Sequence, residues 1–178
     1  MKILAISGSL KSTSSNSSII RAMAAMADDD VQVEIYEGIG NLPHFSPDID
    51  GNKSPESVLD YRNKLKSSDG IVFCTPEYAF GMPGVLKNAL DWIVGSGELV
   101  DKPVAVLSAS PSVLGGEKAH ASLSMTLSVM NATVLEKAKL CIPAVKNKIN
   151  SEGEILDADL SRQLKTVLDV LVKTLREK

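Results

Sequence analysis

Hydroxyl-bearing side chains gather in one segment near the start of the chain, between an apolar run and a stretch with helical periodicity. The segment runs from Ser7 to Ser18 and includes Gly8, Lys11 and Asn16. N–H groups at a helix start carry a partial positive charge and suit a phosphate, to which hydroxyls, an amide and a lysine add donors. The segment lacks the Gly-x-Gly-x-x-Gly and Gly-Lys-Ser/Thr patterns, so it indicates a single phosphate. A serine-rich connector with several N-caps is the structural alternative.

A second unusual segment, Thr75 to Gly84, contains two prolines and two glycines, which give a stiff and sharply shaped loop. Tyr78 and Phe80 supply flat apolar surfaces, and the loop has backbone N–H groups that are free to face a ligand. These features suit a planar polar ring. The alternative is a turn whose aromatic side chains pack on the helix that follows.

A third segment, Ser108 to Gly116, consists mostly of small residues and ends on Gly115-Gly116. Small residues leave room for a flat ligand beside them, although the segment could also be a simple connector. In an open parallel sheet, ligands bind outside the carboxyl ends of the strands. All three segments are expected at that edge, so together they favour a mononucleotide with a planar ring.

The elements that position these segments follow from hydrophobic periodicity. Apolar, strand-like runs occur at 3–6, 31–36, 71–74 and 104–107, with a fifth somewhere in 133–142. Helical stripes include residues 19–27, 58–65, 85–93, 123–130 and 160–175. The second of these helices is opened by Ser54-Pro55-Glu56, with proline expected at the first helical position. We interpret the stripes as core and not as cofactor-binding surfaces.

The alternation of strands and helices predicts one α/β domain over residues 1–178. The expected architecture is a flavodoxin-like three-layer sandwich, with a five-stranded parallel sheet in the order 2-1-3-4-5 and helices on both faces.

Composition excludes several classes of protein. The chain has 178 residues, of which 44% are hydrophobic and 23% charged, and a net charge of −3, which argues against nucleic-acid binding. Apolar runs stay below the roughly 18 residues of a membrane span. The first apolar run breaks at Ser7-Gly8-Ser9, too early for a signal peptide, so a cytoplasmic protein is expected.

The remaining reactive side chains have bland interpretations. Cys74 and Cys141 lie in apolar, strand-like runs and are expected to be buried, reduced thiols, since no Cys-x-x-Cys motif is present. His44 and His120 are expected to have no catalytic role, and no metal site is predicted.

A long polar loop at 38–53 holds Asp48 and Asp50, which could suggest calcium. The rest of a calcium loop is missing, so we interpret it as a solvated loop. Loops of this length often line a site or an interface.

With these motifs in place, the chain resembles the NADPH-dependent FMN reductase family, a flavodoxin-like group that includes bacterial quinone and chromate reductases. The resemblance spans roughly residues 1–142. Gly8-Ser9-Leu10-Lys11 with Ser14 and Asn16 is similar to the family's Gly-Ser-Leu-Arg-x-x-Ser-x-Asn loop. The most specific match is Pro76-Glu77-Tyr78 followed by Pro83-Gly84-Val85-Leu86-Lys87-Asn88-Ala89-Leu90-Asp91-Trp92. Gly115-Gly116 resembles a family Gly-Gly.

The resemblance implies the residues that hold FMN. It places the phosphate near Ser9, Lys11, Ser14, Asn16 and Ser17, and the ring near Pro76, Glu77, Tyr78 and the Ala79 backbone, with Ser110 alongside. Two positions depart from the family pattern. Lys11 replaces an arginine, which keeps the charge but loses the planar fork, and Ala79 replaces an asparagine. The resemblance further implies a homodimer or homotetramer whose second subunit helps to form the flavin site.

The implied activity is that of an NAD(P)H-dependent FMN reductase or quinone oxidoreductase, with NADPH or NADH as hydride donor and a quinone, flavin or similar small molecule as electron acceptor. Because the flavin carries the redox chemistry, no catalytic triad is needed. Two alternatives stay open: a flavodoxin-type electron carrier without nicotinamide activity, and a partner-binding α/β domain without flavin.

Overall fold

The computed structural model describes residues 1–178, with the side chain of residue 52 left aside. The described residues form a parallel sheet of five strands in the order β2-β1-β3-β4-β5. The strands are β1 (Lys2–Ser7), β2 (Gln32–Tyr36), β3 (Gly70–Thr75), β4 (Pro103–Ala109) and β5 (Thr133–Ile142). The parallel sheet and the strand order predicted from the sequence are confirmed.

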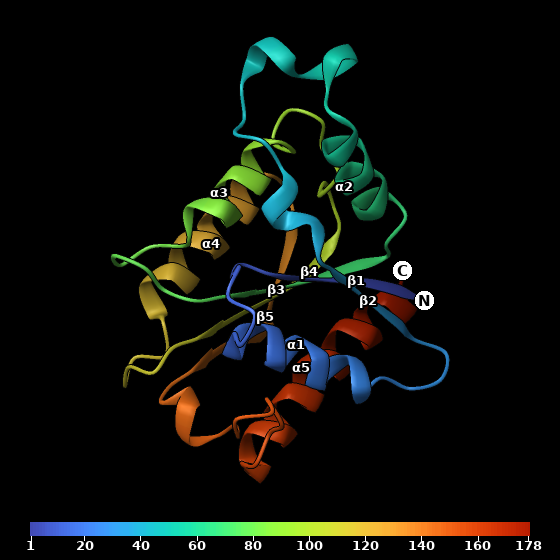
Figure 1. Ribbon diagram of the computed structural model, residues 1–178. Coiled ribbons are helices and arrows are strands. Elements are labelled where there is room, and N and C mark those ends of the chain that lie inside the picture. Colours follow the sequence, from blue (N-terminus) through green and yellow to red (C-terminus); the bar gives the residue numbers. More distant parts are fainter.

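The α-helices cover the sheet on both sides. They are α1 (Ser15–Ala25), α2 (Glu56–Lys66), α3 (Gly84–Asp91), α4 (Glu117–Val129) and α5 (Ala158–Arg176). Helices α1 and α5 lie on one face, and α2, α3 and α4 lie on the other (Figure 1). These three layers are the predicted sandwich.

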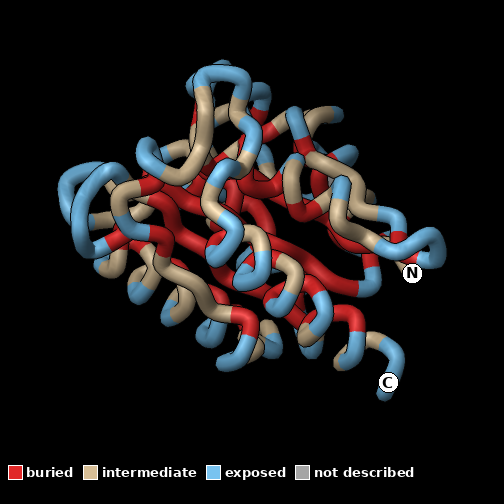
Figure 2. Tube along the Cα trace, turned by 90° about the horizontal axis from the view of Figure 1, so that it is seen from below, coloured by how far each residue is buried: buried red, intermediate tan, exposed pale blue. Residues whose placement is uncertain are grey.

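Alternation of side chains along the strands gives the sheet two apolar faces. In β1, Leu4 and Ile6 pack with α2, α3 and α4, whereas Ile3 and Ala5 pack with α1 and α5. Strands β3 and β4 are buried along their full length, as their continuous apolar sequences predict. Figure 2 shows buried segments running through the middle of the molecule. The sheet is therefore a rigid support for the segments at its edge.

The edge strand β5 is less buried than its sequence suggests. Its register against β4 shifts between Val104 and Val106, where β5 passes from Val134 to Lys139. Cys141 lies in the second part of β5 and is half-buried, whereas Cys74 in central β3 is fully buried. The expectation of two buried thiols is therefore wrong for Cys141, because an edge strand has a neighbour on one side only.

Two helix boundaries differ from the sequence-based expectation. Pro55 is the N-cap of α2, with extended backbone, and the helix begins one residue later at Glu56. Helix α3 ends at Asp91, although the apolar stripe continues to Ile93, which is buried beyond the helix. A buried residue in the loop after a helix can extend the apolar stripe in the sequence, so the stripe predicts a helix that is too long.

The segment 38–53 is more ordered than a solvated loop. It contains three short 3₁₀-helices, η1 (Gly38–Asn41), η2 (Pro47–Ile49) and η3 (Gly51–Lys53), and it buries Ile39 and Leu42 against the core. In Figure 1 the segment projects beyond α2 and α3.

Hydrogen bonds attach this segment to α3 and to its C-cap residue, Trp92. The Asn88 side chain accepts a hydrogen bond from Phe45 N at 2.8 Å and donates one to Pro43 O at 2.9 Å. The Trp92 indole N–H also donates to Pro43 O, at 2.7 Å. Asn88 and Trp92, two residues of the family-like block, therefore fasten a loop and serve the fold.

Two features are not found among the described residues: a cluster of metal ligands and a membrane-spanning helix. No cluster of three or more His, Cys, Asp or Glu side chains there could hold a metal ion. None of the described helices combines the length and apolarity that a membrane crossing requires.

Candidate functional site

The segments singled out in the sequence meet in one cleft at the carboxyl edge of the sheet. The cleft has a volume of about 260 Å³. It is lined by Ser9, Lys11, Thr13, Ser14, Ser15, Asn16, Pro76, Glu77, Tyr78, Ala109, Ser110, Pro111, Val145 and Lys146. Eight of the ten candidate binding residues are among them, so the structure brings together most of what the sequence proposed.

The two other candidates lie beside the cleft. Ser17 lines a neighbouring pocket on the β2 side of the same loop, and its hydroxyl donates to Ser7 Oγ at 2.9 Å. Ala79 lies at the tip of the β3–α3 loop. Neither of these two residues therefore lines the cleft itself.

The N-terminus of α1 opens onto the cleft without a carboxylate of its own. The first hydrogen bond within the helix runs from Ser18 N to Ser14 O at 3.0 Å. The N–H groups of the first turn come before Ser18 in the chain and have no acceptor within the helix. Among the described residues, the N-cap Ser14 makes no side-chain capping bond and the first turn holds no acidic residue. By contrast, α2, α4 and α5 each have an acidic residue in their first turn, whereas α3, like α1, has none. The α1 terminus is thus an uncompensated positive pole, which suits an anion.

The amide of Asn16 is held from two sides. The thiol of Cys74 donates to Asn16 Oδ1 at 3.1 Å, and Asn16 Nδ2 donates to Ala109 O at 3.2 Å. Burial raises the pKa of the Cys74 thiol, so it stays protonated and remains a donor. Asn16 therefore joins the ends of β3 and β4 to α1 and has one N–H left for a ligand.

Glu77 has a structural partner that the sequence did not reveal. Its Oε2 accepts hydrogen bonds from Lys118 N at 2.8 Å and Ala119 N at 3.0 Å, in the first turn of α4. The N-cap of α4 is Gly116, which has no side chain to offer. Glu77 therefore caps α4 from another loop, and the same residue is part of the cleft lining.

The loop after β3 closes with a tight two-residue turn. Tyr78 and Gly81 exchange backbone hydrogen bonds of 3.0 Å in both directions, and the residues between them, Ala79 and Phe80, have φ of +49° and +59°. L-residues avoid this left-handed region, where asparagine and glycine are the usual occupants. The Asn-to-Ala departure at position 79 therefore falls on a conformational requirement.

The alternative interpretation of this loop, that its aromatic side chains pack on α3, is not supported. Tyr78 is 58% exposed and Phe80 is 77% exposed. Tyr78 borders the cleft with much of its ring open to solvent. The cleft is thus open to solvent on the side of Tyr78.

The opposite wall is the β4–α4 loop, fastened to the turn after β5. Val145 N donates to Ser110 O at 3.1 Å and Ala144 N to Ser112 O at 3.0 Å. At Gly115 a Cβ would come within 2.8 Å of Pro143 N, and φ there is +62°. The Gly-Gly motif therefore serves close approach to the β5 end of the sheet.

Sequence reasoning missed Lys146, which lies in η4 (Val145–Asn147) and lines the cleft. It follows β5, so the rule that ligands bind at the carboxyl ends of parallel strands could have found it. The two histidines stay outside the cleft lining. His120 is half-buried with Nε2 3.1 Å from Val106 O, and burial is the main cause that lowers its pKa.

An α/β sandwich with this strand order and a hydroxyl-rich cleft at the carboxyl edge defines a flavodoxin-like nucleotide-binding protein. The family model for NADPH-dependent FMN reductases matches residues 1–146, and the chain belongs to that family. The resemblance drawn from the sequence is confirmed.

Relatives and solved structures agree with this assignment. An NAD(P)H-dependent FMN reductase of Pseudomonas aeruginosa is 32% identical, over 99% of this chain and 97% of its own length. A 2-hydroxy-1,4-benzoquinone reductase of a Burkholderia species is 30% identical, over 100% and 98%. The structure of FerB, a flavoenzyme NAD(P)H:(acceptor) oxidoreductase of Paracoccus denitrificans, superposes with a TM-score of 0.89 at 27% identity, covering 99% of this chain and 97% of that one.

Proposed function

We propose that the chain is an NAD(P)H-dependent, FMN-containing reductase that passes electrons from a nicotinamide to quinones, flavins or similar small acceptors. The observation that carries the proposal is the cleft beside the uncompensated N-terminus of α1. Membership of the NADPH-dependent FMN reductase family and the names of the relatives support the choice of cofactor, donor and acceptor. Residues 1–178 form one FMN-binding domain in this proposal.

The residues at the α1 end of the cleft fit a phosphate. Ser9, Lys11 and Ser14 contribute two hydroxyls and a cation, Asn16 contributes its remaining N–H, and Ser17 contributes the backbone N–H of the first helical turn. A dianionic phosphate here is stabilised by the helix dipole and by donors that no carboxylate occupies.

The residues at the other end of the cleft hold the ring. Pro76, Glu77 and Tyr78 form one wall with the Ala79 backbone beyond them, and Ser110 lies on the opposite wall. Bound FMN supplies the hydride and electron transfer between donor and acceptor. The protein binds and orients it, and the open side at Tyr78 admits small molecules from solvent.

The proposal includes a homodimer or homotetramer in the cytoplasm. An apolar groove of about 290 Å³ lies between α3 and α4. Its lining includes Val94, Met125 and Val129, which are 58%, 67% and 76% exposed. Apolar side chains gathered in this way are typical of subunit contacts. Sedimentation velocity of the purified protein tests the assembly.

The decisive test uses purified protein with and without added FMN. We expect the visible absorption of a protein-bound flavin and FMN-dependent oxidation of NADPH or NADH in the presence of 1,4-benzoquinone. The matched variant is Ser14→Asp, which places a carboxylate at the N-cap of α1. It should fold normally, because aspartate is a good N-cap, yet lose FMN affinity at least tenfold through repulsion of the phosphate.

Two outcomes would contradict the proposal in different ways. Bound FMN that is reduced by dithionite but not by NADPH or NADH would indicate a flavodoxin-type carrier. A protein that stays colourless and shows no FMN binding in a titration would indicate a partner-binding domain without flavin.

A further inference from the structure

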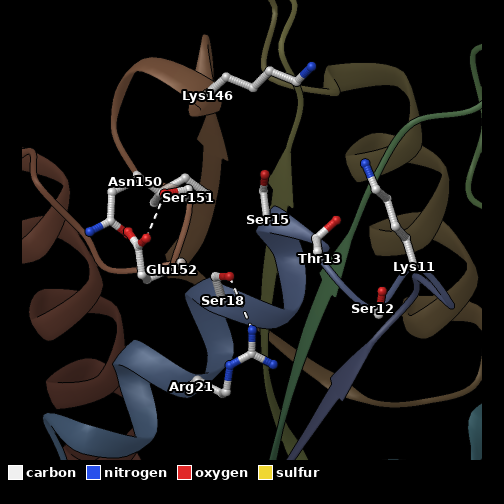
Figure 3. A pocket seen from close by; sticks show the side chains of 12 residues that line it. Lys11, Ser12, Thr13, Ser15, Ser18, Arg21, Lys146, Asn150, Ser151 and Glu152 are labelled. Carbon is white, nitrogen blue, oxygen red and sulfur yellow. Dashed lines mark hydrogen bonds between the residues drawn. The ribbon is translucent and has the colours of Figure 1, made fainter.

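A large pocket lies beside the cleft, on the side of β5 and α5. We call it the lateral pocket. It has a volume of about 460 Å³ and its walls come from the Ser7–Ser18 loop, from α1 and from the segment 146–153 (Figure 3). Lys11, Thr13, Ser15 and Lys146 line both the cleft and the lateral pocket. A ligand in the cleft therefore adjoins a second space of ample size for part of another molecule.

The wall on the α5 side is closely packed against α1. Ile149 and Ile155 form an antiparallel bridge, and Gly153 at the tip has a φ of +86°. A Cβ at Gly153 would lie 2.5 Å from Ser18 Oγ, so this tip touches α1 as only glycine allows. The pocket is thus built by contact between two segments that are far apart in the sequence.

Positive charge predominates in the lateral pocket. Lys11, Arg21 and Lys146 line it against a single carboxylate, Glu152, in a chain whose net charge is −3. Figure 3 shows the three cations arranged around the opening. Lys148 and Lys165 elsewhere form ion pairs with aspartates, whereas no ion pair is found for these three cations within the described part of the chain.

The details of the polar groups favour an anion that carries several acceptor oxygens. Arg21 Nη2 donates to Ser18 Oγ at 3.2 Å, which positions one edge of the guanidinium and leaves its other donors unused. The hydrogen bond from Ser151 is the main cause that lowers the pKa of Glu152, so this carboxylate is charged at neutral pH and opposes an anion. Three cations outweigh it.

We propose that the lateral pocket binds a second phosphoryl group, the ribose 2′-phosphate that distinguishes NADPH from NADH, with Arg21 as its specificity-determining residue. This inference rests on the proposed function, since the donor must reach the pocket from the neighbouring cleft. Lys11 and Lys146 also line the cleft that holds the flavin phosphate in that proposal, whereas Arg21 does not, so Arg21 is the cation left for a second phosphate.

The test compares donors on the FMN-loaded protein. In Arg21→Gln the KM for NADPH should rise at least fivefold, whereas the KM for NADH should stay within twofold of the parent. Glu152→Gln should lower the KM for NADPH, because it removes the opposing charge. Arg162→Gln, an exposed cation of α5 outside the pocket, is the matched control and should change neither constant.

A binding measurement provides a readout apart from turnover. Calorimetric titration with 2′,5′-ADP should show tighter binding than 5′-ADP in the parent, and the difference should vanish in Arg21→Gln. Equal binding of the two nucleotides to the parent would overturn the inference, as would equal changes for NADPH and NADH. Binding of inorganic phosphate that depends on Arg21, with no preference for 2′,5′-ADP, would also overturn it in favour of a free-phosphate site.

These failures are distinguishable from a failure of the proposed function. Loss of the proposed function would appear as absent flavin or absent NAD(P)H oxidation in the parent protein. The inference on the lateral pocket fails when the parent is active and its donor constants are insensitive to Arg21.

Discussion

The thiol of Cys74 and the amide oxygen of Asn16 are joined by a hydrogen bond of 3.1 Å, between a central strand and the first turn of α1. Both side chains are buried, and the other end of the Asn16 amide binds Ala109 O. The hydrogen bond from Cys74, which is fully buried and does not line the cleft, therefore fixes the orientation of the Asn16 amide.

Replacement of Cys74 should weaken FMN binding without removing any cleft residue. A net hydrogen bond contributes about 0.5–1.5 kcal/mol, so Cys74→Ala should raise the FMN dissociation constant roughly two- to tenfold. Quenching of FMN fluorescence on binding gives the constant. Cys74→Ser keeps a donor and should recover most of the affinity, and Cys141→Ala, at the half-buried thiol, is the control. Equal FMN affinity in all variants would show that the hydrogen bond from Cys74 to Asn16 does not contribute to FMN binding.

The turn at Ala79 should respond to asparagine and glycine. Because Ala79 has a φ of +49°, Ala79→Asn is expected to stabilise the protein, by up to about 1 kcal/mol in urea unfolding. Ala121→Asn, at an exposed position of helix α4, is the control. It should destabilise the protein by about 0.5 kcal/mol because asparagine has a lower helix propensity than alanine. A loss of stability in Ala79→Asn would mean that the turn is held by something other than backbone preference. We further expect Ala79→Asn to change the preference among electron acceptors more than the affinity for FMN, because the flavin ring is expected to contact the backbone at this position.

The cap that Glu77 provides should be measurable as stability. Glu77→Ala removes two hydrogen bonds at the start of α4 and should cost about 1–2 kcal/mol of unfolding free energy. Glu117→Ala, an exposed acidic residue in the same helical turn, should cost less than about 0.5 kcal/mol. Similar losses in both variants would indicate a general charge effect at the helix terminus and not a specific cap.

The contact of Asp50 in the segment 38–53 with Arg62 of α2 should weaken in acid. Asp50 accepts from Arg62 Nη2 at 2.8 Å, and this bond is the main cause that lowers the pKa of Asp50. Because the folded pKa lies below the ordinary value, the contribution to stability is present above about pH 4 and falls as the pH drops through the folded pKa. The free energy of unfolding of Asp50→Asn should therefore vary less between about pH 5 and pH 2 than that of the parent. Asp48→Asn, at an exposed position in the same segment, should behave as the parent.

Local signals sufficed for most of the fold because the central strands are buried on both faces. The runs at 71–74 and 104–107 contain no polar side chain, and that pattern fits a doubly covered parallel strand. The exposure of Cys141 could not be predicted, since it depends on the edge position of β5 and on its irregular register. The structure within 38–53 depends on Asn88 and Trp92, which are more than 40 residues away.

The candidate site could be predicted where its residues directly follow a strand in the sequence. It could be predicted less well where a side chain contacts a segment that is distant in the sequence. Ser9, Lys11 and Ser14 follow β1 directly, so strand topology brings them to the cleft. The capping role of Glu77 could not be predicted from a local pattern, because its partners lie 41 and 42 residues further along the chain. Ser17 belongs to the same motif, but its side chain turns to Ser7 on the other side of the loop.

The carboxylate of Glu77 has a consequence for cofactor retention. It ties the ring loop to α4, the helix whose Met125 and Val129 line the apolar groove between α3 and α4. If subunits associate through that groove, occupancy of the cleft and association become linked equilibria, and each changes the affinity of the other by the same factor. With positive coupling, dilution below the dissociation constant of the subunits would release flavin, and saturation with flavin would hold the oligomer together.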